Sequence, residues 1–301
     1  MAKTVKNRKK NLKKSFKKLK CSPLSNKKSG LILKKHTCYN RENLELFKKV
    51  WNENTLKNDN IFTNDPLEIV EFFKTKLNNK CYNELCWLEK KPLDKIPNAE
   101  LIIKETFKPF SPKSWKEKPS EWLSSLDIEK IMKQYEQSHK YFAFIGPSPI
   151  DFDSKELFST CVWEKLCKFD LKTYISKNIS KIGIIFNLDP HYKSGSHWVA
   201  LFIDIKKQFI FYFDSNGTRI PKQINTLVER VKKQGQELDI EFEYNSNFGF
   251  THQYSDGQCG MYTLYFIIEL LKENKTYEYF KTKRIKDKTM KEYRKKYYNT
   301  K

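Results

Sequence analysis

Four polar residues in the second half of the chain have the types and the order that nucleophilic catalysis by a thiol requires. His197 lies 17 residues before Asp214 and 62 residues before Cys259, and Gln253 lies six residues before that cysteine. In such chemistry a thiolate attacks a carbonyl carbon, an imidazole accepts the thiol proton, and a carboxylate orients the imidazole. A glutamine side chain can donate an N–H to the oxyanion that develops. The spacing therefore predicts Cys259 as a nucleophile with His197 as its base.

Each of these residues also has an ordinary structural explanation. A lone cysteine is most often a buried core residue, a lone histidine is a hydrogen-bonded surface or core group, and an aspartate at a strand end often forms a turn. Cys259 differs because it follows the turn sequence Ser255-Asp-Gly257 and begins a helical pattern. The partial positive charge at a helix N-terminus favours a thiolate. The competing bases and orienting groups are His191, His252, Asn216 and Asp204.

The net charge of +22 is concentrated at the two ends of the chain. Residues 1–41 contain 15 Lys or Arg and no acid, and residues 272–301 contain 12 Lys or Arg against 4 acids, whereas the residues between are nearly neutral. Such ends indicate a polyanionic partner, although solubilising tails would have the same composition. The domains that we expect are a basic disordered tail at 1–35, a helical arm at 36–100, a protease-sized core at 101–280 and a basic C-terminal tail at 281–301.

The cysteine content and the lack of long apolar runs set the expected compartment. The chain has seven cysteines, which is an odd number, and no apolar signal segment follows its basic N-terminus. Both observations favour reduced thiols. No apolar run approaches the length of a membrane span, and the cysteines lack zinc-ligand spacing. We expect a monomer without a metal, a cofactor or a membrane span.

Hydrophobic periodicity predicts an α+β protein. Helices are expected over most of 38–91 and at 122–137, 154–169, 221–234 and 259–272, and strands at 182–188, 197–205, 208–214 and 238–244. Lys206-Lys207 fits a tight hairpin between the second and third strands, and their pairing would bring His197 close to Asp214. The expected core is a mostly antiparallel central sheet flanked by helices, preceded by the helical arm.

The order of these motifs resembles that of the Ulp1-like and adenovirus-protease-like cysteine proteases. The residues that carry the resemblance are His197-Trp198, the acid 17 residues later, and Gln253 with five residues before Cys259-Gly260. Trp122-Leu123 resembles the motif that opens their catalytic domain. The segment 186–198 is more similar still to the polyprotein-processing proteases of large cytoplasmic DNA viruses, of the African swine fever virus type. The resemblance covers residues 100–275 well and 36–100 loosely.

The resemblance implies a papain-like or adenain-like core with defined roles for six residues. Cys259 would be the nucleophile, His197 the general base, Asp214 the orienting group, and Gln253 the oxyanion donor beside the Cys259 backbone N–H. Trp198 and Trp122 would flatten the substrate between two indoles and leave a slot that selects glycine. Ordinary core packing is the alternative for both tryptophans.

The implied function is cleavage of viral structural polyproteins after Gly-Gly sites during virion maturation, in the host cytoplasm and the virion. One alternative is a protease that removes SUMO-like or ubiquitin-like modifiers, and another is a non-enzymatic, basic, nucleic-acid-binding virion protein. Ser124-Ser125 stands where SUMO-specific members usually have Asn-Asp, which disfavours the first alternative. The expected partners are a polyprotein substrate and, through the basic ends, nucleic acid bound without sequence preference.

Overall fold

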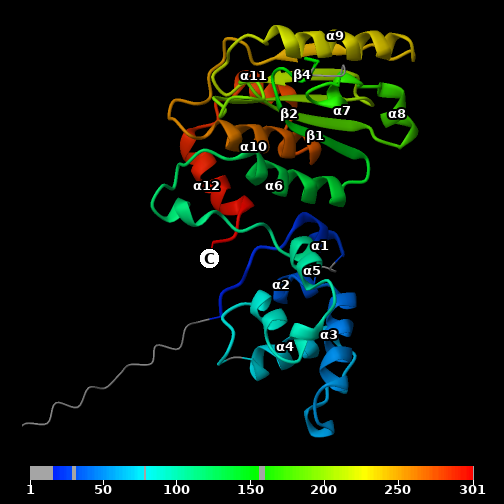
Figure 1. Ribbon diagram of the computed structural model, residues 1–301, viewed down its shortest axis with the longest axis vertical. Coiled ribbons are helices and arrows are strands. Elements are labelled where there is room, and N and C mark those ends of the chain that lie inside the picture. The colour runs from blue at the N-terminus through cyan, green and yellow to red at the C-terminus, as the bar shows by residue number, and fades with distance from the viewer. Residues whose placement is uncertain (1–15, 29–31, 78, 156–159, 301) are drawn as a thin grey trace, which may run out of the picture. The chain divides into compact units, whose positions relative to one another are not determined.

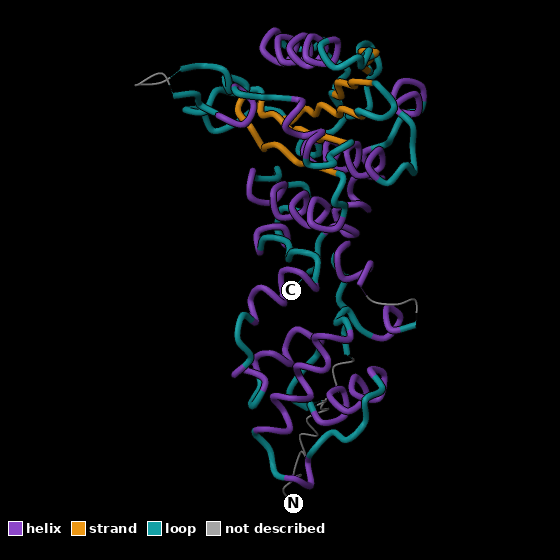
Figure 2. Tube along the Cα trace, turned by 90° about the vertical axis from the view of Figure 1, so that its right-hand side faces the viewer, coloured by secondary structure: helices purple, strands orange, loops and turns teal. Residues whose placement is uncertain are grey.

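The structure is a computed structural model that describes residues 16–28, 32–77, 79–155 and 160–300. The chain divides into two compact units, Met1–Phe107 and Lys108–Lys301 (Figure 1). Among the described residues every strand lies in the second unit (Figure 2).

The first unit is built from short helices around an aromatic core. Tyr39, Phe47, Phe73 and Trp87 are fully buried, and their rings contact one another at centroid distances of 4.7–6.3 Å. Its α-helices are α1 (Pro23–Lys28), α2 (Leu33–His36), α3 (Arg41–Glu53), α4 (Pro66–Lys76) and α5 (Ala99–Thr106), and its 3-10 helices are η1 (Lys57–Asp59), η2 (Glu84–Glu89) and η3 (Leu93–Lys95). The start of α4 is well defined, because the Asp65 side chain accepts from Leu67 N–H and Pro66 occupies the first turn.

The disordered tail predicted for 1–35 is wrong for its described part. Leu19 and Ser22 are buried, and Ser22 N–H donates to the Thr106 carbonyl at 2.8 Å. Residues 1–15 lie outside the described residues. The predicted boundary at 100 also falls inside α5, which belongs to the first unit. The basic composition did not reveal these anchors because a few buried contacts suffice to order a lysine-rich segment.

The second unit contains a five-stranded sheet in the order β1-β2-β3-β4-β5. The strands are β1 (Phe142–Pro149), β2 (Lys181–Asn187), β3 (Trp198–Asp204), β4 (Phe209–Phe213) and β5 (Glu243–Ser246). The β2–β3 and β3–β4 ladders are antiparallel, as expected for the centre of the sheet, whereas both edge ladders are parallel. The edge strand β1 was missed because its Gly146-Pro147 and Pro149 read as a turn.

Helices cover both faces of this sheet, which confirms the α+β architecture. Alternate residues of the central strands face opposite cores: Phe202 and Phe211 lie in one, and Leu201 and Ile210 in the other. Figure 1 shows α9 on one face and α6 with α10 on the other. The helices of this unit are η4 (Lys113–Lys116), α6 (Ser125–Ser138), α7 (Glu164–Cys167), α8 (Leu171–Ser176), α9 (Lys222–Gln236), α10 (Cys259–Leu271), α11 (Tyr277–Thr282) and α12 (Asp287–Tyr297).

Two other expectations about this unit are wrong. The helix predicted over 154–169 is only the single turn α7 within the described residues, because a loop precedes it. The tail predicted for 281–301 is largely folded, since α12 buries Met290, Arg294 and Tyr297. Four lysines and one arginine give α12 a low overall hydrophobicity that hid its apolar face.

The cysteines also differ from the expectation of reduced thiols. Six of them form the disulfides Cys21–Cys38, Cys81–Cys86 and Cys161–Cys167, and Cys259 is the free one. The fold decides these pairings by bringing the Cα atoms to within 5.1–6.2 Å of each other. In the described part of the chain, none of the helices has the length and apolarity needed to cross a bilayer.

Candidate active site

The antiparallel pair β3–β4 positions His197 and Asp214. His197 immediately precedes β3 and Asp214 immediately follows β4, so the ladder that pairs Ala200 with Phe213 places both at one end of the sheet. His197 Nε2 lies 2.6 Å from Asp214 Oδ1. The predicted proximity of these two residues is therefore confirmed, and it follows from strand register alone.

Asp214 is fully buried and its carboxylate is held by several donors. Besides His197, the N–H groups of Asn216 and Thr218 donate to it at 2.9 and 3.1 Å, and the Thr218 hydroxyl donates to Oδ2. Asn247 fixes its backbone, because Oδ1 accepts from Asp214 N–H at 3.0 Å and Nδ2 donates to the Asp214 carbonyl at 2.6 Å. Burial raises the pKa of Asp214, but the hydrogen bond and charge of His197 and the other donors outweigh burial and lower the pKa.

Cys259 is the first residue of α10, as the sequence predicts, and it is 3% exposed. The turn before it approaches the segment that precedes α6 very closely. A Cβ on Gly257, whose φ is +82°, would lie 2.1 Å from the Ser120 carbonyl oxygen, and a Cβ on Gly260 would lie 3.0 Å from Leu123. Glycine is thus required at 257 to seat the start of α10 against this segment.

The environment of His197 favours its protonated form. Burial lowers the pKa of His197, but hydrogen bonds to Asp214 and Cys259 and the charges of both groups outweigh burial and raise the pKa to about 9. Because Nε2 is engaged by Asp214, Nδ1 is the nitrogen left for the thiol. The arrangement can take the thiol proton on Nδ1 and hold the resulting imidazolium against a buried carboxylate.

Gln253 is oriented by Ser215, a residue that the sequence did not single out. Ser215 Oγ donates to Gln253 Oε1 at 2.9 Å, and Gln253 Nε2 donates to the Ser255 carbonyl at 2.8 Å. A side-chain amide has two N–H donors, so the bond to Ser255 leaves one N–H of Gln253 for the predicted contact with an oxyanion. The N–H groups of the first turn of α10 have no intrahelical acceptor and are available for the same charge.

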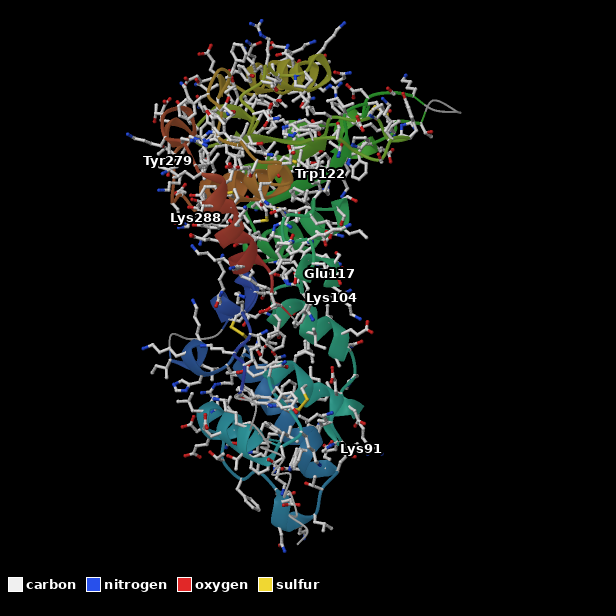
Figure 3. All side chains as sticks on the ribbon, turned by 90° about the vertical axis from the view of Figure 1, so that its left-hand side faces the viewer. Lys91, Lys104, Glu117, Trp122, Tyr279 and Lys288 are labelled. Atoms are coloured by element: carbon white, nitrogen blue, oxygen red, sulfur yellow. A yellow bond between two sulfur atoms is a disulfide. The ribbon has the colours of Figure 1, made fainter. Side chains whose placement is uncertain are left out.

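Trp122 and Trp198 line the same cavity, which has a volume of about 790 Å³. Trp122 is 48% exposed and therefore does not fill the core, whereas Trp198 is 7% exposed. Trp198 Nε1 donates to the carbonyl of Leu123, the residue after Trp122, at 3.0 Å, which fixes the Trp198 ring against this segment. Figure 3 labels Trp122, whose Cδ1 would lie 3.3 Å from a Cβ on Gly257, beside the turn that leads to Cys259.

The competing residues occupy other environments. His191 Nδ1 lies 2.7 Å from Asp151 Oδ2 on the wall of the cavity. His252 is fully buried with Nδ1 accepting from Ile285 N–H and Nε2 donating to the Phe280 carbonyl, so it is a structural histidine. The remaining two candidates are also accounted for: Asp204 lies at the far end of β3, and Asn216 serves Asp214 through its backbone N–H.

Thr218, Asn247 and Ser215 are the supporting residues that sequence reasoning missed. Thr218 and Ser215 follow Asp214 closely, so proximity in sequence is a weak signal for them. Asn247 is 33 residues away and carried no local signal. Among the described residues, no group of three or more His, Cys, Asp or Glu side chains could hold a metal ion.

Comparison with known proteins agrees with this geometry. Residues 164–301 match the Ulp1 protease family, C-terminal catalytic domain. The chain is 32% identical over 213 residues to a protein of Acanthamoeba polyphaga mimivirus that is provisionally named a thiol protease, covering 69% of this chain and 66% of that protein. It is 27% identical over 180 residues to a cysteine protease of African swine fever virus strain Badajoz 1971, covering 57% and 66%.

A solved structure shares the fold. The crystal structure of the African swine fever virus protease matches with a TM-score of 0.63 and 22% identity, over 78% of this chain and 89% of that one. At 22% identity, this similarity shows the fold alone. The chain spans 66% of the length of the curated relatives it matches.

Proposed function

Since residues 164–301 form a cysteine protease domain of the Ulp1 family, we propose that the protein is an endopeptidase that cleaves viral structural polyproteins after Gly-Gly sites during virion maturation. The observation that carries the proposal is the apposition of His197 and Asp214 at 2.6 Å beside Cys259, next to a cavity lined by two tryptophans. A binding module has no use for this combination. The roles of the individual residues remain predictions.

The two tryptophans support a preference for glycine. The hydrogen bond from Trp198 Nε1 to the Leu123 carbonyl holds the Trp198 ring close to the segment that carries Trp122, and Trp122 lies beside the turn before Cys259. In the proposed binding mode, the substrate residue just before the scissile bond passes this turn. Large rigid rings tolerate a flat glycine backbone there better than one carrying a Cβ.

The experiment is cleavage of a fluorogenic peptide library by the purified chain, with Cys259→Ala as the matched inactive control. We expect cleavage after Gly-Gly, and replacement of the glycine before the scissile bond by alanine should lower kcat/KM by roughly 10–200-fold. Equal cleavage after alanine would contradict the glycine preference. Turnover by the Cys259→Ala variant would refute the thiol mechanism.

A modifier-removing protease is the second candidate, because the African swine fever virus relative bears the name SUMO-1 cysteine protease in other isolates. In this chain Ser124 serves as the N-cap of α6 and forms a capping box with Asp127, a structural role. Incubation with a folded SUMO conjugate and with a Gly-Gly polyprotein junction distinguishes the two. Faster release from the conjugate would favour the second candidate.

Nucleic acid is a proposed partner of the basic segments. The lysines of α12 lie on a folded helix, and residues 1–15 lie outside the described residues. We propose that these segments bind DNA or RNA without sequence preference, which would concentrate the enzyme in the viral factory and the virion. Affinity measured by fluorescence anisotropy should fall steeply as salt rises; salt-independent binding would refute this.

A further inference from the structure

A second cavity in the catalytic unit has a strongly basic lining. It has a volume of about 380 Å³ and lies between the 111–120 segment and α12. Its cationic residues are Lys113, Lys116, Lys291, Arg294 and Lys295, and its lining includes no Asp or Glu. None of these five cations lies within 4.0 Å of a carboxylate in the described part of the chain.

Arg294 concentrates positive charge in the wall of this cavity. It is 5% exposed, and its guanidinium stacks 4.2 Å over the ring of Trp115. Arg294 Nε and Trp115 Nε1 are both buried N–H donors without an acceptor among the described residues. The carboxylates of Glu121 and Asp127 act on Arg294 only through their charge. Both residues line the cavity that contains Trp122 and Trp198, not the basic cavity. A buried cation without a paired anion is costly, so an anion in this cavity would lower the free energy.

The basic cavity is separate from the proposed substrate site, but Arg294 in its wall contacts segments that border that site. Pro112 lines both cavities, and Ser120 of the basic cavity is followed in the chain by Glu121 of the other cavity. Arg294 donates to the Glu121 carbonyl at 2.7 Å and to the Gly257 carbonyl at 3.1 Å. One side chain thus borders the basic cavity and also holds the turn before Cys259.

The walls restrict the chemistry of the ligand. Trp115 and Tyr298 meet edge to face at 4.9 Å and, with Pro112 and Pro119, supply apolar surface below the lysines. The volume lies in the range of small-molecule sites and is too small for a nucleic acid duplex. Lysine ammonium groups bind phosphate as point charges. We propose that this cavity binds a small organic polyphosphate, with its phosphates on the lysines and its organic part on the aromatic wall.

The test is isothermal titration calorimetry of the full chain with adenosine triphosphate as probe, and with inorganic tripolyphosphate to separate phosphate from the organic part. We expect micromolar binding of adenosine triphosphate and at least about tenfold weaker binding of tripolyphosphate. The double variant Lys291→Ala/Lys295→Ala should weaken binding of adenosine triphosphate at least tenfold. These lysines are exposed, so an unchanged circular dichroism spectrum should accompany the loss.

The matched control is Lys283→Ala/Lys288→Ala, which removes two exposed charges from the same region outside the cavity (Lys288 is labelled in Figure 3). This control should bind within twofold of the parent. Equal losses in both double variants would show a diffuse charge effect and overturn the proposal. It would equally be overturned by no binding at millimolar probe in low salt.

Discussion

Replacement of Asp214 by asparagine tests how the structure sets the protonation of His197. The change keeps the shape of the side chain but removes the charge that lies 2.6 Å from His197 Nε2. An asparagine has one acceptor oxygen, whereas backbone N–H groups of Asn216 and Thr218 donate to different oxygens of the carboxylate. One of these two N–H groups must therefore lose its partner.

The size of the effect follows from the pKa of His197. Its rise from 6.5 to about 9 corresponds to about 3 kcal/mol of preference for the imidazolium. Because the pKa of His197 is raised, its protonated form stabilises the folded protein fully below about pH 6.5. This stabilisation is lost as pH rises through about 9. Asp214 and Cys259 together cause the rise in the pKa of His197. We therefore expect Asp214→Asn to lower this pKa by about one to two pH units. One to two units correspond to about 1.4–2.8 kcal/mol less stabilisation of the imidazolium that forms in the reaction, which is about 10–100-fold in kcat/KM.

The assay is the pH profile of kcat/KM on a fluorogenic peptide between pH 5 and 10.5, together with the rate of iodoacetamide labelling of Cys259. The parent should keep its activity up to about pH 9, because the imidazolium persists to that pH. The alkaline limb should move to about pH 7–8 in Asp214→Asn. Thermal unfolding should also show a loss of about 1–3 kcal/mol from the orphaned donor.

Asp151→Asn is the matched control, since Asp151 pairs with His191 at 2.7 Å. It should leave the alkaline limb where it is in the parent. If Asp214→Asn leaves the limb near pH 9, or if Asp151→Asn moves it instead, the assignment of His197 and Asp214 is refuted.

Three further substitutions test the rest of the site. Gln253→Ala should lower kcat by roughly 10²–10³ with little change in KM if its amide donates to the oxyanion, and an effect on KM alone in steady-state kinetics would argue against that role. Trp122→Ala should relax the glycine preference in the peptide library while thermal unfolding stays close to the parent, because the side chain is 48% exposed; unchanged selectivity would leave Trp122 without a substrate role. Gly257→Ala should lower both the unfolding temperature and kcat, because its Cβ would meet Ser120 O at 2.1 Å, and wild-type values for both would contradict the described turn.

The place of Cys259 at the start of α10 could be predicted from the sequence because the signals are local. The turn before Cys259, the apolar pattern of α10 and the alternation of β3 and β4 all depend on neighbouring residues. The short Lys206-Lys207 link then requires β3 and β4 to pair, and antiparallel register brings His197 to Asp214. Periodicity and turn chemistry are sufficient for this much of the site.

Contacts between distant residues decided the remainder, and no local pattern encodes them. Asn247 reaches Asp214 across 33 residues, and Arg294 reaches Gly257 across 37. The partner of the competing histidine was not foreseen either, because Asp151 reaches His191 across 40 residues. Likewise, the ends predicted as tails are ordered where buried side chains such as Leu19 anchor them. Composition specifies the charge of a segment, whereas packing against the rest of the chain decides whether that segment is folded.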